Sequence, residues 1–459
     1  MSTTARLDLD ELASSIAGSL VRASDPDYDA ARALWNGMIE RRPAVIVRCA
    51  GAEDVRTALA FARRHDLPVA VRGGGHNVAG RSMNDGGLVL DLSRMREVRV
   101  DAEARLARVE AGATIGDLDR ATQAHGLATT GGVHSGTGVA GLTLGGGIGY
   151  LARAYGLTVD NLVAVDVVLA DGSRVRADAD TNSDLFWAVR GGGGAIGIVT
   201  AFTFALHPVG PDVAVVQAFY RVEDAPSVLR AYRDAMADAV DEVGCYALFV
   251  HVPPIEPFPS DLHGTVALAL VGCYAGDPAV GVPALERFTT MAEPILASVS
   301  ATPYVDLQCA FDAGTPDGGR YYYKAEFLPG LPDAAIDVLV ERVRTVPGTY
   351  TIIGIEPLGG AIARVPRSGT PFPHRDAAFN LGIWAGWQDP AADASTIAWA
   401  RDLHAVMAPF GTGGVYANYL DADDAGRADA AFGPNVERLR SIELRFDPDG
   451  VFRAGRRTS

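Results

Sequence analysis

The chain has 459 residues, of which 48% are hydrophobic and 21% charged, and it carries a formal net charge of −16 at pH 7. This composition is typical of a soluble globular protein that is long enough for two domains. The excess of acidic residues argues against nucleic acid or an anionic membrane as a partner, because such partners require a basic surface.

The four cysteines, at positions 49, 245, 273 and 309, are far apart and form no CxxC pair. Neither a disulfide framework nor a zinc site is therefore expected, and no other metal site is predicted. The first residues lack the apolar stretch of a secretion signal, and no apolar run reaches membrane-spanning length. The sequence favours a cytoplasmic protein.

Residues 1–38 are expected to be mostly helical. A strand at 43–48, an amphipathic helix at 52–65 and a strand at 68–72 then predict a β-α-β unit that leads into Gly73, Gly74 and Gly75. Consecutive glycines favour a turn whose N–H groups form a concave nest for a phosphate or pyrophosphate. His76 follows at the rim of this nest. The alternative is a glycine-rich loop with an incidental histidine.

A second glycine-rich segment spans residues 129–150, after expected strands at 88–92, 98–100 and 106–109 and a helix at 115–125. Its Gly136-Thr-Gly138-Val-Ala-Gly141 stretch fits GxGxxG. That motif requires a helix directly after it, and the glycines at 145–147 would break such a helix within one turn. We therefore expect an extended segment against a flat ligand and not a Rossmann fingerprint.

A third glycine cluster, at residues 190–194, lies among expected strands at 161–169, 174–177 and 196–206 and a short helix at 185–189. The stretch His207-Pro-Val-Gly-Pro211 then marks a domain boundary. Beyond it, strands are expected at 213–222, 246–252, 265–274, 320–328, 350–358 and 379–387, and helices at 225–242, 279–299, 332–346 and 391–408. This pattern predicts an α+β domain with a large antiparallel sheet covered by helices on one face.

Alternation along three of these strands predicts the two faces of the sheet. One face is expected to pack on helices, and the other to present Lys324, Glu356, Asn380 and Trp384. Polar and aromatic groups that converge on one face are typical of a ligand-binding floor. A sheet that is half exposed to water would show the same pattern and is the alternative.

The last residues contain the stretch Val415-Tyr-Ala-Asn-Tyr-Leu420 and an expected helix near 432–446, and their glycine and tyrosine content resembles that of the first domain. We therefore expect the tail to return there. The predicted organisation is an N-terminal helical segment (1–38), a cofactor domain (39–211), a substrate domain (212–409) and a C-terminal return (410–459).

Several stretches in a fixed order carry a family resemblance: Arg72-Gly-Gly-Gly-His76, Leu90-Asp-Leu-Ser93, Gly138-Val-Ala-Gly-Leu-Thr-Leu-Gly-Gly-Gly147, residues 190–200, Tyr321-Tyr-Tyr-Lys324, Phe372-Pro-His-Arg375, Tyr416-Ala-Asn-Tyr419 and Phe446-Asp-Pro448. With them the chain resembles the berberine bridge enzyme-like FAD-linked oxidases of the vanillyl-alcohol oxidase fold group. In layout it is similar to the bacterial 6-hydroxy-D-nicotine oxidase type. The resemblance implies a PCMH-type FAD-binding domain of two α/β subdomains.

The resemblance also implies that FAD places its pyrophosphate on the nest and is bonded covalently through its 8α carbon to His76. A neutral imidazole nitrogen is a competent nucleophile for such a bond. A histidine that only hydrogen-bonds the phosphate is the alternative. The other cofactor-binding residues that the resemblance implies are Arg72, Gly73, Gly74, Gly75, Asn77, Val78, Leu92, Gly132, His134, Gly138, Gly141, Leu142, Gly145, Gly149, Gly197, Ile198, Val199, Tyr416 and Asn418.

The chain departs from the family pattern at two places. Doubly linked members carry a cysteine where this chain has His134, and no cysteine lies within 80 residues of it. We therefore predict a single link through His76, no cysteinyl link, and a polar contact from His134. Ala195 and Ile196 replace a common Asn-Phe pair, so one side-chain contact to the flavin is expected to be missing.

For catalysis, Tyr419, Glu356 and Lys324 are the predicted residues, and Tyr322, Asn380 and Trp384 are predicted to contact the substrate. A tyrosine has an ordinary pKa of about 10, so Tyr419 could serve as a base near neutrality only beside a cation such as Lys324. An amine substrate would require no strong base. The alternative is that Tyr419 and Glu356 are ordinary wall residues. His374 is interpreted as structural.

The sequence thus predicts an FAD-dependent oxidase that takes hydride from a small-molecule alcohol, hemiacetal or amine to flavin N5 and is reoxidised by dioxygen to hydrogen peroxide. A dehydrogenase with another acceptor and a flavin-binding protein without turnover are the alternatives. The expected partners are the substrate and dioxygen. A homodimer is left open, and the substrate itself cannot be read from the chain.

Overall fold

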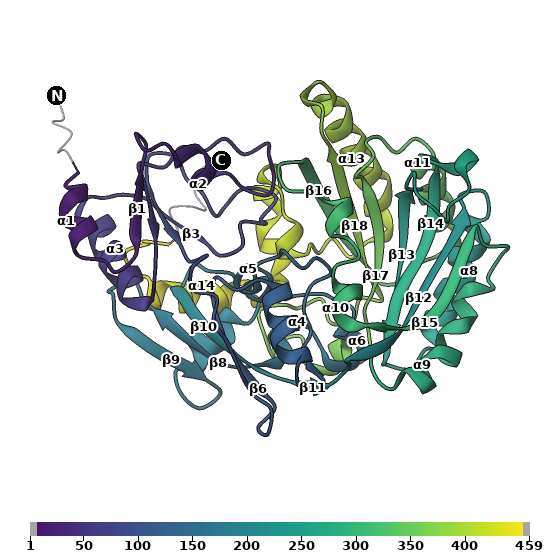
Figure 1. The fold of residues 1–459 in the computed structure, drawn as a ribbon, viewed down its shortest axis with the longest axis horizontal. Helices are drawn as coiled ribbons and strands as arrows, with labels where there is room; N and C mark the ends of the chain where they lie inside the picture. Colours follow the sequence, from purple (N-terminus) through teal and green to yellow (C-terminus); the bar gives the residue numbers. More distant parts are fainter. Residues whose placement is uncertain (1–6, 453–459) are drawn as a thin grey trace.

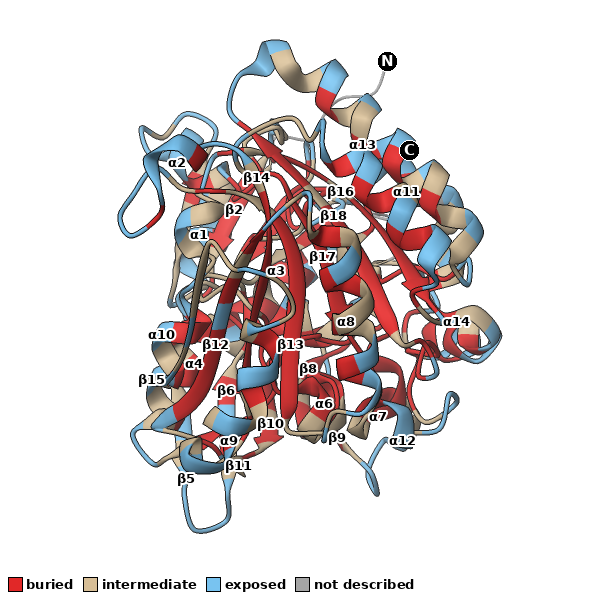
Figure 2. Ribbon diagram, turned by 90° about the vertical axis from the view of Figure 1, so that its right-hand side faces the viewer, coloured by how far each residue is buried: buried red, intermediate tan, exposed pale blue. Residues whose placement is uncertain are grey.

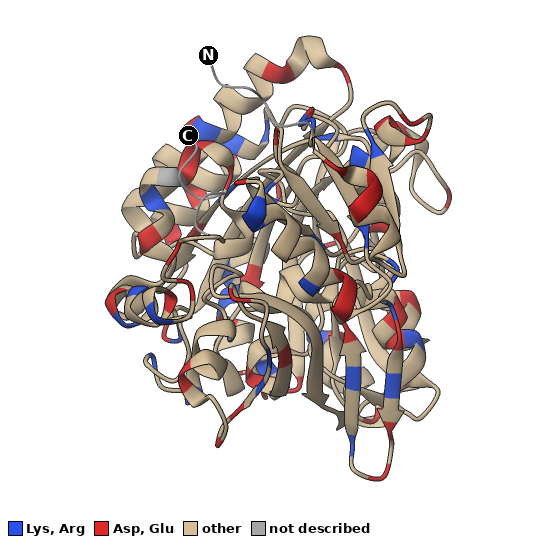
Figure 3. Ribbon diagram, turned by 90° about the vertical axis from the view of Figure 1, so that its left-hand side faces the viewer, with Lys and Arg blue, Asp and Glu red and all other residues tan. Residues whose placement is uncertain are grey.

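The computed structural model describes residues 7–452, which fold into two halves that lie side by side (Figure 1). The half at the left of Figure 1 contains two small sheets, the half at the right contains one large sheet, and a fourth sheet has only two strands. Within the described residues, no helix is both long and apolar enough to span a bilayer. Acidic and basic positions are interspersed on the elements of the left-hand side (Figure 3).

The first sheet has four strands in the order β1-β2-β4-β3. Three of them are parallel neighbours, β2 (Val45–Arg48), β4 (Leu88–Asp91) and β3 (Val69–Arg72), and α3 (Ala52–Arg64) connects β2 to β3. This is the expected β-α-β unit. The parallel register ends at Arg72, so the chain enters the first glycine cluster at the carboxyl edge of the sheet.

The expectation of a mostly helical N-terminal segment is wrong. Of the described residues in this segment, only α1 (Leu9–Ser14) and α2 (Tyr28–Arg32) are α-helical. Between them β1 (Ser19–Arg22) pairs antiparallel to β2 and buries Val21, which is 2% exposed. A long-range pairing of this kind overrides the local helical pattern. Residues 1–6 lie outside the described part of the chain.

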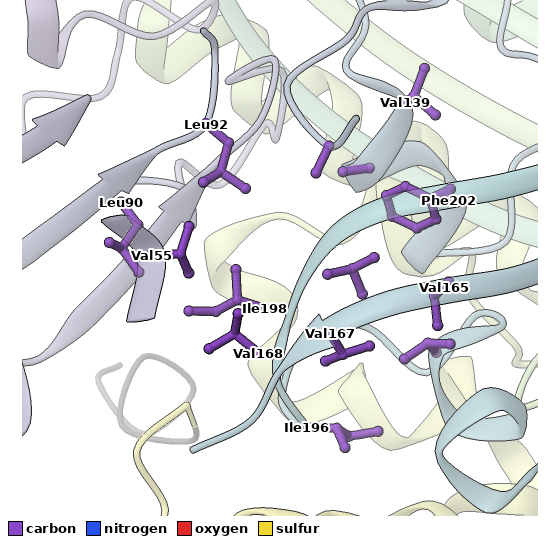
Figure 4. Packing of buried hydrophobic residues seen from close by; sticks show 14 of the residues in the cluster. Val55, Leu90, Leu92, Val139, Val165, Val167, Val168, Ile196, Ile198 and Phe202 are labelled. Atoms are coloured by element: carbon purple, nitrogen blue, oxygen red, sulfur yellow. The ribbon is translucent and has the colours of Figure 1, made fainter. Parts of the chain in front are cut away.

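The second sheet has five antiparallel strands in the order β5-β6-β10-β8-β9. Its strands are β5 (Val98–Asp101), β6 (Leu106–Glu110), β10 (Ile198–Ala205), β8 (Leu162–Val168) and β9 (Arg174–Asp178). Figure 4 shows how its apolar side chains, among them Val168 and Ile198, meet Val55 of α3 and Leu90 of β4 in one core. This half also contains α4 (Ile115–Gln123), β7 (Leu127–Ala128), α7 (Ser183–Val189) and β11 (His207–Pro208), whereas α6 (Ala152–Tyr155) packs against β13 (Val243–His251) of the large sheet.

The second glycine-rich segment is not extended throughout, as was expected. α5 (Val139–Leu144) follows Gly138 directly. It ends after six residues at Gly145, and Gly146 and Gly147 adopt positive φ angles of 121° and 85°. The glycines thus stop the helix early, as the sequence indicated, but the short helix itself was missed.

The large sheet has seven strands in the order β15-β12-β14-β13-β17-β18-β16, and every neighbouring pair is antiparallel. The strands are β12 (Asp212–Arg221), β13 (Val243–His251), β14 (Val266–Tyr274), β15 (Leu296–Pro303), β16 (Arg320–Leu328), β17 (Ile352–Pro357) and β18 (Phe379–Trp387). This confirms the predicted α+β fold. The predicted helix at 279–299 is wrong beyond residue 289, because Pro294 precedes the edge strand β15.

Helices cover one face of this sheet. They are α8 (Ala225–Ala237), α9 (Pro278–Leu285), α11 (Asp333–Val343) and α13 (Asp393–Met407). Their inward sides are buried and their outward sides exposed, as Figure 2 shows for α8, α11 and α13. The opposite face of the sheet turns toward the first half of the molecule, where short α10 (Tyr304–Gln308) and α12 (Ala361–Arg364) also lie.

The C-terminal residues return to the first half. Val415, Leu420 and Phe432 pack in the core that contains the two small sheets, together with Leu439 and Ile442 of α14 (Val436–Phe446). In Figure 1 this segment is yellow and passes between the halves before it reaches α14. The tail therefore contacts both the glycine-rich segment and the large sheet.

Candidate functional site

The first glycine cluster forms the predicted nest. The backbone N–H groups of the six residues from Gly73 to Val78 donate to no acceptor within residues 7–452. Gly75 has a φ of 72°, a conformation that favours glycine. A Cβ atom on Gly74 would lie 2.4 Å from the backbone nitrogen of Gly138, so the first two glycine clusters meet here in direct backbone contact. Successive free N–H groups in a turn suit an anion.

His76 lies at the rim of the nest with both ring nitrogens unpaired among the described residues. Its ring is 5.1 Å from that of Trp35, nearly parallel to it at 16°, and 4.8 Å from that of His134. Burial, with a smaller contribution from His134, lowers the pKa of His76 to about 3. The imidazole is therefore neutral at physiological pH, with a lone pair free to react.

His134 is fixed in a different way. Its Nδ1 atom accepts the N–H of Gly136 at 3.0 Å and lies 3.5 Å from a carboxylate oxygen of Asp312. Burial lowers the pKa of His134, and Asp312 opposes this shift. Its Nδ1 lone pair is thus already engaged, in contrast to the nitrogens of His76. Cys309 approaches Ser135 from the other half of the molecule, a neighbour that spacing along the sequence does not reveal.

The tail fastens the second glycine segment. The hydroxyl of Tyr416 accepts the N–H groups of Gly147 at 2.9 Å and Ile148 at 3.1 Å, and Asn418 donates to the carbonyl of Leu142 at 3.0 Å. A Cβ on Gly145 would lie 2.0 Å from Asn418. The Tyr416 hydroxyl and the amide nitrogen of Asn418 therefore bond the protein chain and hold the glycine segment in shape.

A buried acid lies next to this anchor. Glu356, 1% exposed, accepts the hydroxyl of Tyr419 at 3.0 Å and the amide of Asn380 at 2.5 Å. Burial raises the pKa of Glu356 to about 7, and the two hydrogen bonds oppose the rise. The Tyr419 ring lies 4.7 Å from that of Tyr416. The acid thus faces the space beside the glycine segment and can exchange a proton near neutral pH.

Two further polar atoms in this region have no partner among the described residues, Oδ1 of Asn380 and Nε1 of Trp384. The indole of Trp384 lies over Gly354 and Gly382, whose Cβ atoms would come within 2.5 Å and 2.4 Å of it. Its ring also contacts Tyr419, with centroids 5.6 Å apart. An unpaired acceptor and an unpaired donor therefore flank the acid, as a small polar ligand requires.

The predicted placement of Lys324 and Tyr322 on this face is wrong. Lys324 pairs in register with Ile383 of the helix-packed core and bonds Asp423 and Asp424 at 2.6 Å and 2.8 Å. The Tyr322 hydroxyl bonds Asp423 at 2.6 Å. Both side chains therefore lie on the helix-covered face, opposite to Glu356. Three tyrosines in a row leave the direction of the alternation undecided, which is why the sequence did not fix it.

Comparisons with known proteins agree with this geometry. Residues 43–178 match the FAD binding domain family, and residues 415–455 match the family described as berberine and berberine like. An uncharacterised FAD-linked oxidoreductase of Bacillus subtilis, YgaK, is 31% identical over 95% of this chain and 96% of its own length. The chain belongs to the berberine bridge enzyme-like FAD-linked oxidoreductases.

Solved structures of this family share the fold. The 6-hydroxy-D-nicotine oxidase of Arthrobacter nicotinovorans superimposes with a TM-score of 0.84 at 25% identity, covering 95% of this chain and 97% of the other. The berberine bridge enzyme-like protein 1 of the moss Physcomitrella patens gives a TM-score of 0.85 at 25% identity, covering 97% of both chains. The protein is thus an FAD-binding enzyme with a PCMH-type cofactor domain.

The described residues fit FAD in an FAD-linked oxidoreductase. The nest offers unpaired N–H groups for the pyrophosphate, and a Cβ on Gly141 would meet no protein atom within 4 Å. We call the nest and the open backbone at Gly141 the cofactor groove. The other residues that the resemblance implies for the cofactor differ in how deeply they are buried. Leu92, Ile198 and Val199 are core residues, each at most 5% exposed, whereas Gly149 and Gly197 leave no room for a side chain.

Several residues of this region were missed by sequence reasoning. Trp35 stacks on His76 and comes from the N-terminal segment that was expected to be mostly helical. Tyr323 contacts Tyr419 edge-on at 5.9 Å, on the face where Tyr322 was expected. Gln308 donates to the carbonyl of Gly132 at 3.0 Å from the other half of the molecule. The only signal in the sequence was the alternation within Tyr321–Tyr323, which allows Tyr323 to lie on the face of Glu356 if the opposite alternation is chosen.

Proposed function

We propose that this enzyme is an FAD-dependent oxidase whose flavin is linked through His76, and that it oxidises a small-molecule alcohol, hemiacetal or amine with dioxygen as the final electron acceptor. The observation that carries the proposal is the buried Glu356–Tyr419 pair beside the groove. A carboxyl with a pKa of about 7 is suited to take a proton from a substrate hydroxyl at neutral pH.

Bound FAD supplies the acceptor for the substrate hydride at N5. Glu356 takes the hydroxyl proton, directly or through the Tyr419 hydroxyl that donates to it. Burial and the nearby carboxylate raise the pKa of Tyr419 well above its ordinary value, so Tyr419 relays a proton and does not act as a phenolate base. The idea that Lys324 lowers this pKa is wrong, because Lys324 lies on the other face of the sheet. An amine substrate would use Glu356 to lose its ammonium proton.

The unpaired, neutral imidazole of His76 supports the proposed link, since only an unprotonated ring nitrogen can form the bond. His134 is less suited, because its Nδ1 accepts a backbone N–H. The relative named 6-hydroxy-D-nicotine oxidase supports an amine as one substrate class to test and dioxygen as the acceptor.

Two measurements test the proposal. His76→Ala is expected to release its FAD into the supernatant on acid precipitation, whereas wild type and the matched His134→Ala variant keep the yellow colour in the pellet. Flavin that stays in the His76→Ala pellet would show that the link lies elsewhere. An anaerobic screen with alcohols, sugars and amines should bleach the flavin with one class, and peroxide yield against turnover of an artificial acceptor distinguishes an oxidase from a dehydrogenase. No bleaching by any class would contradict turnover.

A further inference from the structure

The loop that carries His76 does not hold its imidazole in one orientation. The three residues before it are glycines, and neither ring nitrogen has a hydrogen-bond partner among the described residues. Among the described residues, two rings flank it and limit its plane: Trp35, nearly parallel at 5.1 Å, and His134, tilted by 57° at 4.8 Å. We propose that Trp35 is a positioning residue that holds the His76 imidazole for covalent attachment of the flavin. This inference rests on the proposed link.

Trp35 is itself held rigidly. Its other face stacks on Tyr321 with centroids 3.8 Å apart and planes 8° from parallel, and its Nε1 donates to the carbonyl of Thr315 at 3.0 Å. The next residue, Asn36, donates to the carbonyls of Val78 and Tyr321 at 2.7 Å and 2.9 Å. Trp35 and Asn36 therefore join the His76 loop to strand β16 of the other half, and the indole forms a fixed wall.

A fixed wall matters because the reactive lone pair lies in the plane of the imidazole. Rotation about the Cβ–Cγ bond would turn this lone pair away from the flavin methyl group, and the parallel indole excludes most of that rotation. Correct orientation of two reacting groups contributes orders of magnitude to a rate, and loss of orientation costs about 10-fold to 100-fold. Trp35 is 6% exposed, so it also keeps water from one face of the ring.

The attachment step is an oxidation. A ring nitrogen of neutral His76 replaces one hydrogen of the flavin 8α methyl group, so a C–H bond and the imidazole N–H bond break and an N–C bond forms. The two electrons and two protons that are released reduce one dioxygen to hydrogen peroxide. The linked protein therefore gains the mass of one FAD less two hydrogens. Trp35 takes no part in the bond changes.

The test compares planar and non-planar replacements of similar bulk. Trp35→Met fills the space with a flexible chain, and Trp35→Phe keeps a flat ring. The full-length chain of each variant is incubated in air with FAD at several concentrations, and the linked fraction is followed by intact mass. Trp399→Met, on the distant helix α13, is the matched control. Melting temperatures show that each variant is folded, and Trp35→Leu repeats the comparison if Trp35→Met does not fold.

Trp35→Met is expected to lower the limiting rate of attachment at least about 10-fold while the half-saturating FAD concentration changes little. Trp35→Phe should recover most of the rate, and Trp399→Met should match wild type. A folded Trp35→Met or Trp35→Leu protein that attaches flavin at the wild-type limiting rate would overturn the inference. Attachment that persists in His76→Ala would instead refute the proposed link, so the two failures are distinguishable.

Discussion

Glu356→Gln is expected to make the protein more stable and less active, and the gain in stability should depend on pH. The ordinary pKa of this carboxyl is 4.5, and burial raises it to about 7 in the folded protein. Below pH 4.5 the group is protonated in both the folded and unfolded states. Between pH 4.5 and 7 only the unfolded state releases its proton, so the free energy of unfolding falls as pH rises.

The size of this effect follows from the two pKa values. Above pH 7 the buried charge costs the folded wild type about 3 kcal/mol relative to a group with an unchanged pKa. Glutamine removes this cost. It can also keep both hydrogen bonds, because Oδ1 of Asn380 has no partner and a half-turn of that amide lets it accept from the new side chain. The variant should therefore gain about 3 kcal/mol at pH 8 and little at pH 4.5.

Urea denaturation between pH 4.5 and 8.5, followed by circular dichroism, measures this difference. Anaerobic flavin reduction by an alcohol substrate should slow by about 100-fold or more, since the proposed general base is lost. Glu326→Gln is the matched control: Glu326 is equally buried but accepts from Arg427 at 3.0 Å, so this variant should lose about 2 kcal/mol. A Glu356→Gln stability difference that is the same at every pH would refute the reasoning.

Three further outcomes are expected. Tyr419→Phe removes a hydrogen bond that lowers the pKa of Glu356, so the acid limb of the pH–rate profile for flavin reduction should move to higher pH. An unchanged acid limb would show that the Tyr419 hydroxyl does not influence the titration of Glu356. Lys324→Met should cost about 3 kcal/mol in a denaturation assay because buried Asp424 loses its ion-pair partner at 2.8 Å and is left with Arg427 at 3.8 Å, yet it should leave the flavin reduction rate unchanged. A slowed rate without destabilisation would place Lys324 in the site. Gly74→Ala should abolish FAD binding, measured by absorbance, and should lower the melting temperature of the flavin-free chain. Gly141→Ala should reduce only FAD binding. Equal melting temperatures for both variants would contradict the difference in packing between these two glycines.

The cofactor groove was predictable because its cause is local. A cluster of glycines indicates that another part of the chain or a ligand approaches the backbone closely, and the contact between Gly74 and Gly138 is of this kind. The placement of Glu356 and Asn380 on one face of the sheet also followed from alternation along two strands whose apolar residues indicate the helix-packed face. Both features can be read without knowledge of the neighbouring chain.

The missed features depend on the partner in space. Which side chains of β16 face the helices is decided by Asp423 and Asp424, which bond Lys324 on that face. The sequence alone does not decide it, because Tyr322 and Tyr323 suit either face of the sheet equally well. Trp35 acquires its role only because β16 brings Tyr321 behind it. The edge strand β15 was missed because its pairing with β12 overrides the helical character of the preceding residues.

The anchoring of the glycine segment by the tail has a consequence for biosynthesis. Tyr416 is synthesised 269 residues after Gly147, whose N–H it binds. At ordinary elongation rates this interval is about 15–50 s, during which the emerging segment lacks its anchor. The cofactor groove therefore lacks its anchor until Tyr416 has left the ribosome, so stable capture of FAD follows the synthesis of both halves and depends on the cofactor supply at that moment.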